Sequence, residues 1–449
     1  MTTNDPPCLS GQAWMSKPPK TTPSSPVTQF EWLADFRLLL YLFIGFRLLM
    51  GVVYQPYTFE RYKQDGSPTV IERGMSTFGD LRYYYYFARQ SVEGDLPYRD
   101  YWYEFPPVSI GLFAGVYGIG QLRGQFSYAS WATLIGFIML AFDVGNLVLL
   151  RRLARRLHGE AAAVALPWFY ALLAAPAIFP WWTFETLVVF LMLLSLVWLL
   201  EGRDRRSALV TAAGILTKYT PILLLPTIWR FYDRKLALRY TLIVLLIVAL
   251  VFALLIAWGG RMAVASLLAQ FNKASYQSVW ALLDDNLRTG RFSPTDTRLD
   301  PDTSFKPYGN APVIPAWLRL IPFAAAGLFI FTRRLRQDDR GIVAFFSVTI
   351  ILFFLWTQGW SPQWALTLTP LILLNFPDRN GVLLCLVIGF AGFIEYPAMF
   401  MRTAETEGEI TTALLPTYVT IILMRTAVLI GLVIALYRLL IQEVGHERA

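Results

Sequence analysis

The stretch Phe78–Pro107, FGDLRYYYYFARQSVEGDLPYRDYWYEFPP, is the most informative part of this chain. It is rich in charged and aromatic residues, and it follows the first long apolar segment, at 33–54. The part LRYYYYFARQSVEG reads as an amphipathic helix, with tyrosines that would lie at a membrane interface. A chain of apolar segments has little reason to concentrate polar chemistry here, so we expect this loop to carry the functional site.

The composition around this loop predicts an all-α polytopic membrane protein. Of the 449 residues, 55% are hydrophobic, 15% aromatic and only 16% charged. These values exclude a disordered chain and are unusual for a soluble domain. Many apolar runs approach the roughly 20 residues that a helix needs to cross a bilayer. The net charge of +8 comes from basic residues in short loops, so it does not indicate nucleic-acid binding.

The apolar segments predict about 12 transmembrane helices. The clear spans are 33–54, 128–150, 161–179, 184–200, 240–258, 315–332, 341–356, 364–376, 381–395 and 413–439. The segment 207–229 has basic residues at both ends and Lys218 in its middle, so we interpret it as a hairpin of two short helices. The segment 106–122 is shorter than a span, and we place it in the first external loop as a half-inserted helix.

The basic residues predict the orientation of the chain. Clusters of arginine and lysine lie at 151–156, 203–206, 230–239 and 333–340. Such clusters stay on the cytoplasmic side, so both termini should be cytoplasmic in a cell inner (plasma) membrane. Two long loops, about 55–127 and 259–314, are then external. Residues 1–29, rich in Pro, Ser and Thr, read as a disordered cytoplasmic tail, and 30–449 as one transmembrane domain.

Asp80 is the leading candidate for a catalytic group, although it also has a simpler interpretation. It precedes a plausible helix, so it could be an N-cap or a solvated loop carboxylate. It could also act as a general base at the membrane surface. The only histidines, His158 and His446, fall on the cytoplasmic side. An external base must therefore be a carboxylate, apart from the less suitable lysines and tyrosines.

Lys218 stands out because a lysine inside an apolar stretch is costly unless it reaches water, a partner or an anion. It could extend to the interface, pair with an intramembrane acid such as Asp143, or bind a lipid phosphate. Asp284 and Asp285 are adjacent, but no histidine or cysteine accompanies them, so we predict no metal and no cofactor. Cys8 and Cys385 should not form a disulfide.

Other external residues could contact a sugar or an acceptor. The turn from Trp356 to Trp364 could be an interfacial aromatic belt or a rim that stacks on sugars. Glu185 begins a span on the outer side and could line the same cavity. The full set of candidate contacts is Tyr84, Glu104, Glu185, Gln358, Trp360 and Gln363.

The order of these elements resembles the GT-C superfamily of membrane glycosyltransferases. The first span is followed by a long external loop with an early acid in Gly79-Asp80, then by Gly94-Asp95-Leu96-Pro97-Tyr98 and Pro106-Pro107. A Leu216-Thr217-Lys218 hairpin and a second long loop complete the order. Within the superfamily the chain looks most like family 87, the polyprenol-phosphate-mannose-dependent α-mannosyltransferases.

This resemblance implies a GT-C-like fold and an inverting transfer of a hexose, mannose, from a polyprenyl-phosphate sugar to a lipid or glycan acceptor. It implies that Asp80 is the base, and that Lys218 holds the carrier phosphate together with an external arginine, Arg82 or Arg288. Related enzymes often carry a histidine where this chain has Gln363, which leaves the acceptor and the sugar open. No Asp-x-Asp-like metal pattern is evident, so we expect a metal-independent enzyme.

Two other functions remain open from the sequence. A transporter or flippase for a lipid-linked saccharide would show repeated halves and charges deep inside several spans. An O-antigen-type polymerase or ligase would use a diphosphate carrier and would place its large external loop late in the chain. Most acids of this chain lie in external loops instead, which favours chemistry at the membrane surface.

Overall fold

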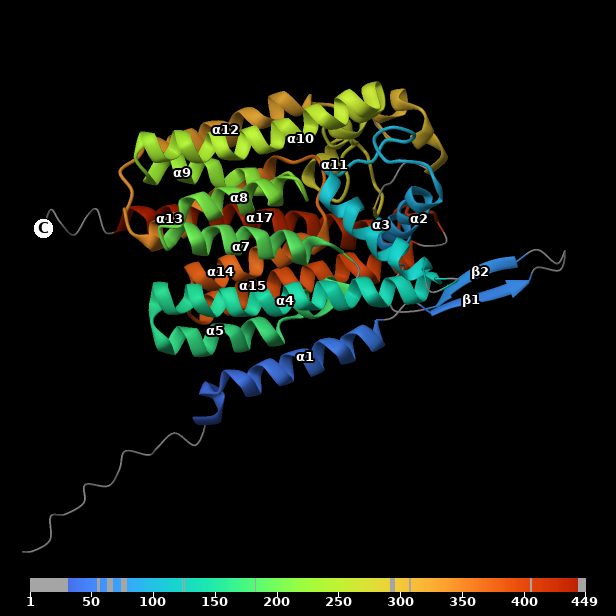
Figure 1. Cartoon of the computed structure of the whole chain (residues 1–449). Coiled ribbons are helices and arrows are strands. Elements are labelled where there is room, and N and C mark those ends of the chain that lie inside the picture. Colours follow the sequence, from blue (N-terminus) through green and yellow to red (C-terminus); the bar gives the residue numbers. More distant parts are fainter. Residues whose placement is uncertain are drawn as a thin grey trace, which may run out of the picture.

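The chain forms a bundle of helices with short elements gathered at one end (Figure 1). The computed structural model describes residues 31–54, 57–62, 68–73, 79–122, 124, 126–181, 183–290, 295–306, 308–403 and 406–442. Within these ranges the only sheet is an antiparallel hairpin of β1 (Tyr57–Tyr62) and β2 (Pro68–Arg73). The expected tail at 1–29, with Cys8, lies outside the described residues.

Six described helices are long and apolar enough to cross a membrane. They are α1 (Phe36–Val53), α4 (Tyr128–His158), α10 (Arg234–Leu268), α13 (Asp339–Trp356), α15 (Arg379–Phe393, continuous with the short helices that follow it) and α17 (Leu415–Ile441). The number rises to seven if the bent pair of α5 (Glu160–Leu172) and α6 (Ala174–Ile178) is one span. On α10 the side chains of Leu246, Leu250 and Leu254 share one helical face and are exposed, as expected of a lipid-facing surface.

The remaining expected spans are shorter helices, so the count of 12 is not confirmed. These helices are α7 (Glu185–Leu200), α8 (Asp204–Ile215), α9 (Leu225–Phe231), α12 (Ala316–Thr332) and α14 (Ala365–Asn375). They lie alongside the longer helices in the bundle (Figure 1). Each segment that was expected to span the membrane does contain a helix. The architecture is therefore that of an all-α polytopic membrane protein.

A buried ion pair joins α1 to α4. The Arg47 Nε donates to Asp143 at 2.9 Å, and the Tyr170 hydroxyl donates to the same carboxylate at 2.6 Å. Both side chains of the ion pair are fully buried. Asp143 thus has a packing role, and the suggestion that it pairs with Lys218 is wrong because Arg47 occupies it.

Lys218 lies where the chain reverses between α8 and α9. Helix α8 ends at Ile215, and the chain continues through the short helix η3 (Thr220–Leu224) into α9. A Cβ on Gly214 would lie 3.0 Å from Pro221, so the turn is tightly packed. The backbone amide of Val108 donates to the carbonyl of Leu216 at 2.9 Å. The tip of this hairpin is therefore held against the start of α3 (Pro107–Gln121).

Helices α2 (Gly79–Glu93) and α3 pack together beside the hairpin tip and are not among the candidate spans. Tyr84 of α2 stacks on Phe113 of α3, with ring centroids 4.8 Å apart. Tyr83 and Tyr84 are buried in protein, which corrects the expectation of an interfacial position for these two tyrosines, whereas Tyr86 is exposed. This packing fixes the first turn of α2, and with it Asp80, against the end of the bundle.

Candidate active site

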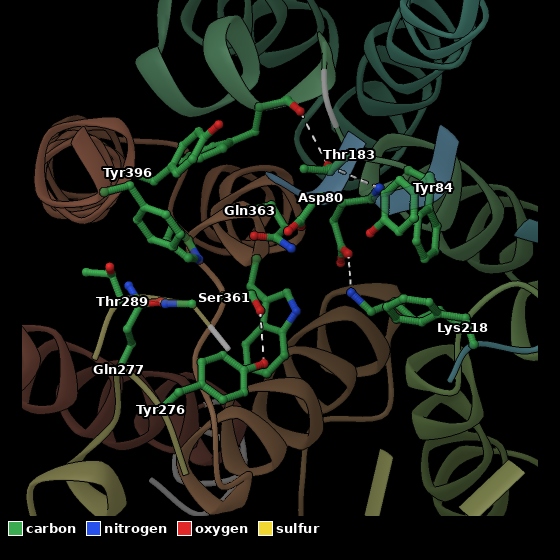
Figure 2. Close-up of a pocket in the computed structure, with 18 of the residues that line it drawn as sticks. Asp80, Tyr84, Thr183, Lys218, Tyr276, Gln277, Thr289, Ser361, Gln363 and Tyr396 are labelled. Carbon is green, nitrogen blue, oxygen red and sulfur yellow. Dashed lines mark hydrogen bonds and ion pairs between the residues drawn. The ribbon is translucent and has the colours of Figure 1, made fainter. Parts of the chain in front are cut away.

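A cavity of about 250 Å³ opens where α2, the hairpin tip and the loops after α10 and α13 meet. The charged residues in its wall are Asp80, Glu185, Lys218 and Lys273. Its uncharged polar residues include Tyr84, Thr183, Tyr276, Gln277, Thr289, Ser361, Gln363 and Tyr396. In Figure 2, Asp80 and Gln363 lie between Lys218 on one side and Tyr396, Thr289 and Gln277 on the other. Asp80 and Lys218 thus share one cavity.

Asp80 is a half-buried carboxylate with no hydrogen bond or ion pair to any residue that the structure describes. Burial and, to a smaller extent, the negative charge of Glu104 raise the pKa of Asp80 to about 6, although Lys273 and Lys218 oppose the shift. The carboxylate is therefore ionised at neutral pH and able to accept a proton. No described residue pairs with this charge.

The other buried acids of the described chain all have partners. Glu395 forms an ion pair with Arg425 and accepts a hydrogen bond from Trp360. Asp143 has Arg47, as described above. Glu104, Glu185 and Asp284 are paired with Lys273, Lys218 and Arg319. A carboxylate that served only packing would be expected to have such a partner. Asp80 has none among the described residues.

Lys218 reaches the cavity and forms an ion pair with Glu185. Its Nζ lies 5.8 Å from the ring centroids of both Phe184 and Trp364, so the ammonium is also held over aromatic faces. The second oxygen of Glu185 accepts a hydrogen bond of 3.1 Å from Thr367. Glu185 therefore lines the cavity as expected, but its oxygens position Lys218 and are not free for a sugar.

Lys273 is a second cation in the cavity wall, and the sequence analysis gave it no role. Its Nζ lies 2.9 Å from Glu104, whose other oxygen accepts from Arg298 at 2.9 Å. Burial alone would raise the pKa of Glu104, but Lys273 and Arg298 outweigh it and lower the pKa. Glu104 is thus an ionised anchor for Lys273, and the structure does not place it in the cavity wall as a sugar contact.

The two arginines expected at the carrier phosphate lie elsewhere. Arg82 projects from the exposed face of α2, opposite to the buried Tyr83 and Tyr84, and does not line the cavity. Arg288 forms an ion pair with Glu409 and does not line it either. The cations that the fold does bring to the cavity are the two lysines.

Two expected contacts in the outer turn are also displaced. Trp360 is buried, and its Nε1 donates to Glu395 at 2.9 Å instead of facing the cavity. Gln358 lines a neighbouring pocket, and its carbonyl accepts from the Ser278 hydroxyl at 2.5 Å. Of this turn, Gln363 faces the cavity, and its amide has no hydrogen-bond partner within the described chain.

An apolar path leads away from the lysines. A second pocket of about 310 Å³ shares Lys218, Lys273 and Trp364 with the first cavity. It shares Leu320 and Phe353 with a third, almost wholly apolar groove of about 460 Å³ between α12 and α13. The apolar path thus runs from the two lysines past the hairpin tip to the groove between α12 and α13.

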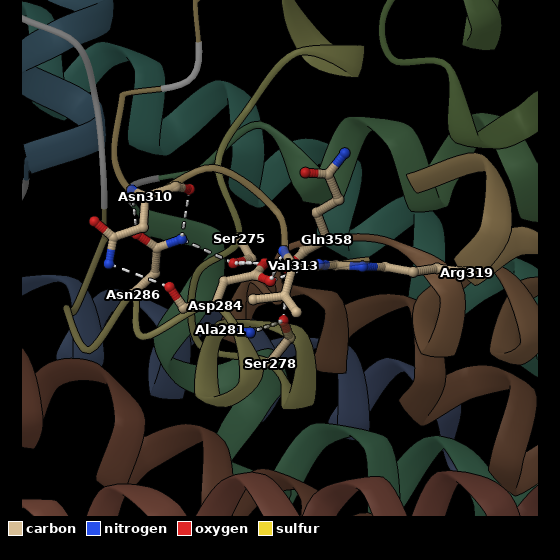
Figure 3. A network of polar contacts seen from close by, with 9 residues as sticks. All are labelled: Ser275, Ser278, Ala281, Asp284, Asn286, Asn310, Val313, Arg319 and Gln358. Carbon is tan, nitrogen blue, oxygen red and sulfur yellow. Dashed lines mark hydrogen bonds and ion pairs between the residues drawn. The ribbon is translucent and has the colours of Figure 1, made fainter. Parts of the chain in front are cut away.

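Asp284 is bound within a network of polar contacts and does not face the cavity (Figure 3). Arg319 donates to both of its oxygens, at 2.6 and 2.8 Å, and the Ser275 hydroxyl donates at 2.6 Å. In the described part of the chain, no three His, Cys, Asp or Glu residues are grouped as a metal site would require.

No family model matches the chain, and no curated protein is similar in sequence. Among solved structures, the chain is similar to the Archaeoglobus fulgidus oligosaccharyltransferase in its apo form, with a TM-score of 0.44 and 13% identity. It is also similar to that enzyme, AglB, in complex with an inhibitory peptide and a dolichol-phosphate, with a TM-score of 0.41 and 13% identity. These matches cover 91% and 90% of this chain but only 56% of the archaeal chains.

Proposed function

We propose that this chain is a membrane glycosyltransferase that uses a polyprenyl-phosphate sugar as donor and Asp80 as general base. The observation that carries the proposal is the surroundings of Asp80. An ionisable carboxylate without a described partner faces a cavity whose wall holds two lysines, and those lysines also border an apolar path. A base, a phosphate-binding pair and a lipid groove are the three parts that such a transfer needs.

The donor phosphate would bind between Lys218 and Lys273. Each lysine is held by a glutamate, so its ammonium is in place before the ligand arrives. Lys218, Lys273 and Arg298 together offset the charges of Glu104, Glu185 and Asp80, so a phosphate would meet two positioned ammonium groups without a net negative charge around them. The isoprenoid tail would follow the apolar path into the groove between α12 and α13.

The reaction would be a single displacement with inversion at the anomeric carbon. Asp80 takes the proton of an acceptor hydroxyl while the hydroxyl oxygen forms a bond to that carbon. The bond between the carbon and the phosphate oxygen breaks, and the polyprenyl phosphate leaves with the electron pair. Lys218 and Lys273 stabilise the charge that develops on it. Phosphate is a good leaving group, so one carboxylate suffices, unlike the pair in a glycosidase.

The active site would lie on the extracytoplasmic side. The clusters with Arg155 and Arg340 belong to the end of α4 and the start of α13, at the opposite end of the bundle from α2 and α3. If the basic end is cytoplasmic, the cavity faces outward. The motif order relates the chain to the GT-C superfamily, and its likeness to family 87 makes mannose the sugar that we propose.

The test is transfer by the purified full-length protein in lipid nanodiscs. Polyprenyl-phosphate mannose is supplied with a panel of octyl glycosides, and the released polyprenyl phosphate and any new glycoside are measured by mass spectrometry. We expect release of the monophosphate carrier and a product of inverted configuration. No release from this donor, with release from a diphosphate-linked oligosaccharide, would overturn the proposal in favour of a polymerase or ligase.

A further inference from the structure

The cavity has two ends of different charge. The lysines lie at the end that adjoins the apolar path. At the other end the wall is formed by Gln277, Thr289 and Tyr396, which Figure 2 shows away from Lys218, and Ser361 and Gln363 lie between the two ends. None of them is charged. Beyond Lys218 and Lys273, the described lining of the cavity contains no lysine, arginine or histidine.

A cation behind this uncharged wall is already neutralised. Arg425 donates to the carbonyl of Gln277, but it is paired with Glu395 and lies over the face of Trp360, 4.4 Å from the ring centroid. It is buried and does not line the cavity. Among the described residues, a ligand at the uncharged end would therefore meet no positive charge, and Asp80 lies between Lys218 and the side chains of Tyr396, Thr289 and Gln277 (Figure 2).

The same end offers groups that suit a sugar ring. Tyr396 lies between Phe179 and Phe400, with ring centroids at 6.1 and 5.1 Å, and all three residues line the cavity. Aromatic faces of this kind pack against the apolar face of a hexose. The Gln363 amide, which has no hydrogen-bond partner among the described residues, offers a donor and an acceptor for its hydroxyls.

We propose that the acceptor unit bound at this end is a neutral carbohydrate, and that a sugar bearing a phosphate or carboxylate there is rejected. This inference rests on the proposed function, because it takes Asp80 as the base. An anionic group at the uncharged end would lie beside the ionised Asp80 with no described cation to balance it, and such uncompensated like charges are strongly unfavourable. Selection against anionic acceptors would thus come from the charge pattern of the cavity.

The experiment compares octyl hexosides with the same hexosides carrying a 6-phosphate. Polyprenyl-phosphate mannose is the donor, and donor hydrolysis without acceptor is measured in parallel. We expect a kcat/KM at least about tenfold higher for the neutral member of each pair. Equal or better use of the phosphorylated probes would overturn the inference, as would donor hydrolysis without transfer to any neutral probe. If the donor is not consumed at all, the proposed function itself fails.

A matched pair of variants at Gln363 tests whether the charge pattern is the cause. Gln363→Lys should raise the ratio of phosphorylated to neutral acceptor use by severalfold, even if both rates fall. Gln363→Glu should lower that ratio further, and Gln363→Met, which changes no charge, should leave it near the wild-type value. A ratio that does not follow the sign of the new charge would contradict the proposal.

Discussion

Asp80 and Asp284 are both aspartates at the end of the bundle that holds α2 and α11 (Val279–Leu283), but their surroundings differ (Figures 1–3). Asp284 is bound on both oxygens by Arg319 and also accepts from Ser275 and from the backbone amide of Val313. Asp80 has no such partner within the described chain and faces a cavity. Asp284 is held in a buried ion pair, whereas Asp80 faces a cavity and has no described partner.

The raised pKa of Asp80 predicts how the stability of the folded protein should change with pH. The pKa of Asp80 is raised from 3.8 to about 6, so its ionised form is less stable in the folded than in the unfolded protein. This penalty is absent below about pH 4, grows between about pH 4 and pH 6, and stays constant above that at no more than about 3 kcal/mol. Asp284 is instead held in a buried ion pair, and its loss would leave the buried Arg319 without a partner.

The largest effect is expected from Asp80→Asn. The amide keeps the shape of the side chain but cannot take a proton, so transfer should fall about a thousandfold. The melting temperature in detergent should stay equal or rise, because the penalty of the buried charge is removed. Asp95→Asn, at an exposed position outside the cavity, is the matched control and should keep wild-type activity. Retention of more than a tenth of the activity by Asp80→Asn would exclude this base.

The reverse outcome is expected at the paired aspartate. Asp284→Asn breaks a fully buried ion pair and should destabilise the protein by about 3–5 kcal/mol, seen as a large fall in melting temperature. Asp285→Asn changes the exposed neighbour and should be close to neutral. The double variant Asp284→Asn/Arg319→Met should recover part of the loss. If Asp284→Asn melted like the wild type, the contrast between the two aspartates would be lost.

The contrast also shows what could be predicted from the sequence. Hydropathy places a helix in each expected span. The polar character of the first loop, the apolar surroundings of Lys218 and the family resemblance pointed to Asp80, Lys218 and Gln363, which do line one cavity. The partners of charged residues were not predictable, because pairs such as Glu104 with Lys273 join distant loops. The choice of Arg82 over Lys273 failed for this reason: nearness in sequence to Asp80 does not decide which cation shares its cavity.

A smaller effect is expected from the lysines of the cavity. Lys273→Met should lower kcat/KM for the donor about 10- to 100-fold, and it leaves Glu104 paired with Arg298. Lys218→Met would leave Glu185 buried without a cation, so it is best made together with Glu185→Gln. Arg82→Gln and Arg288→Gln serve as controls and should reduce kcat/KM less than threefold. Weaker inhibition by free polyprenyl phosphate in the lysine variants, but not in the controls, would locate the phosphate.

The smallest effect concerns the pH dependence, which reports the charges around Asp80. Because a general base must be ionised, kcat/KM should fall below about pH 6, the pKa to which burial raises Asp80. Lys273 lowers that pKa, so Lys273→Gln should move the acidic limb of the profile to higher pH by a fraction of a unit. A limb that stays in place would mean that the titrating group does not sense Lys273. A limb that moves to lower pH would contradict the placement of Asp80 beside this cation, whereas a purely structural aspartate would give no acidic limb near pH 6.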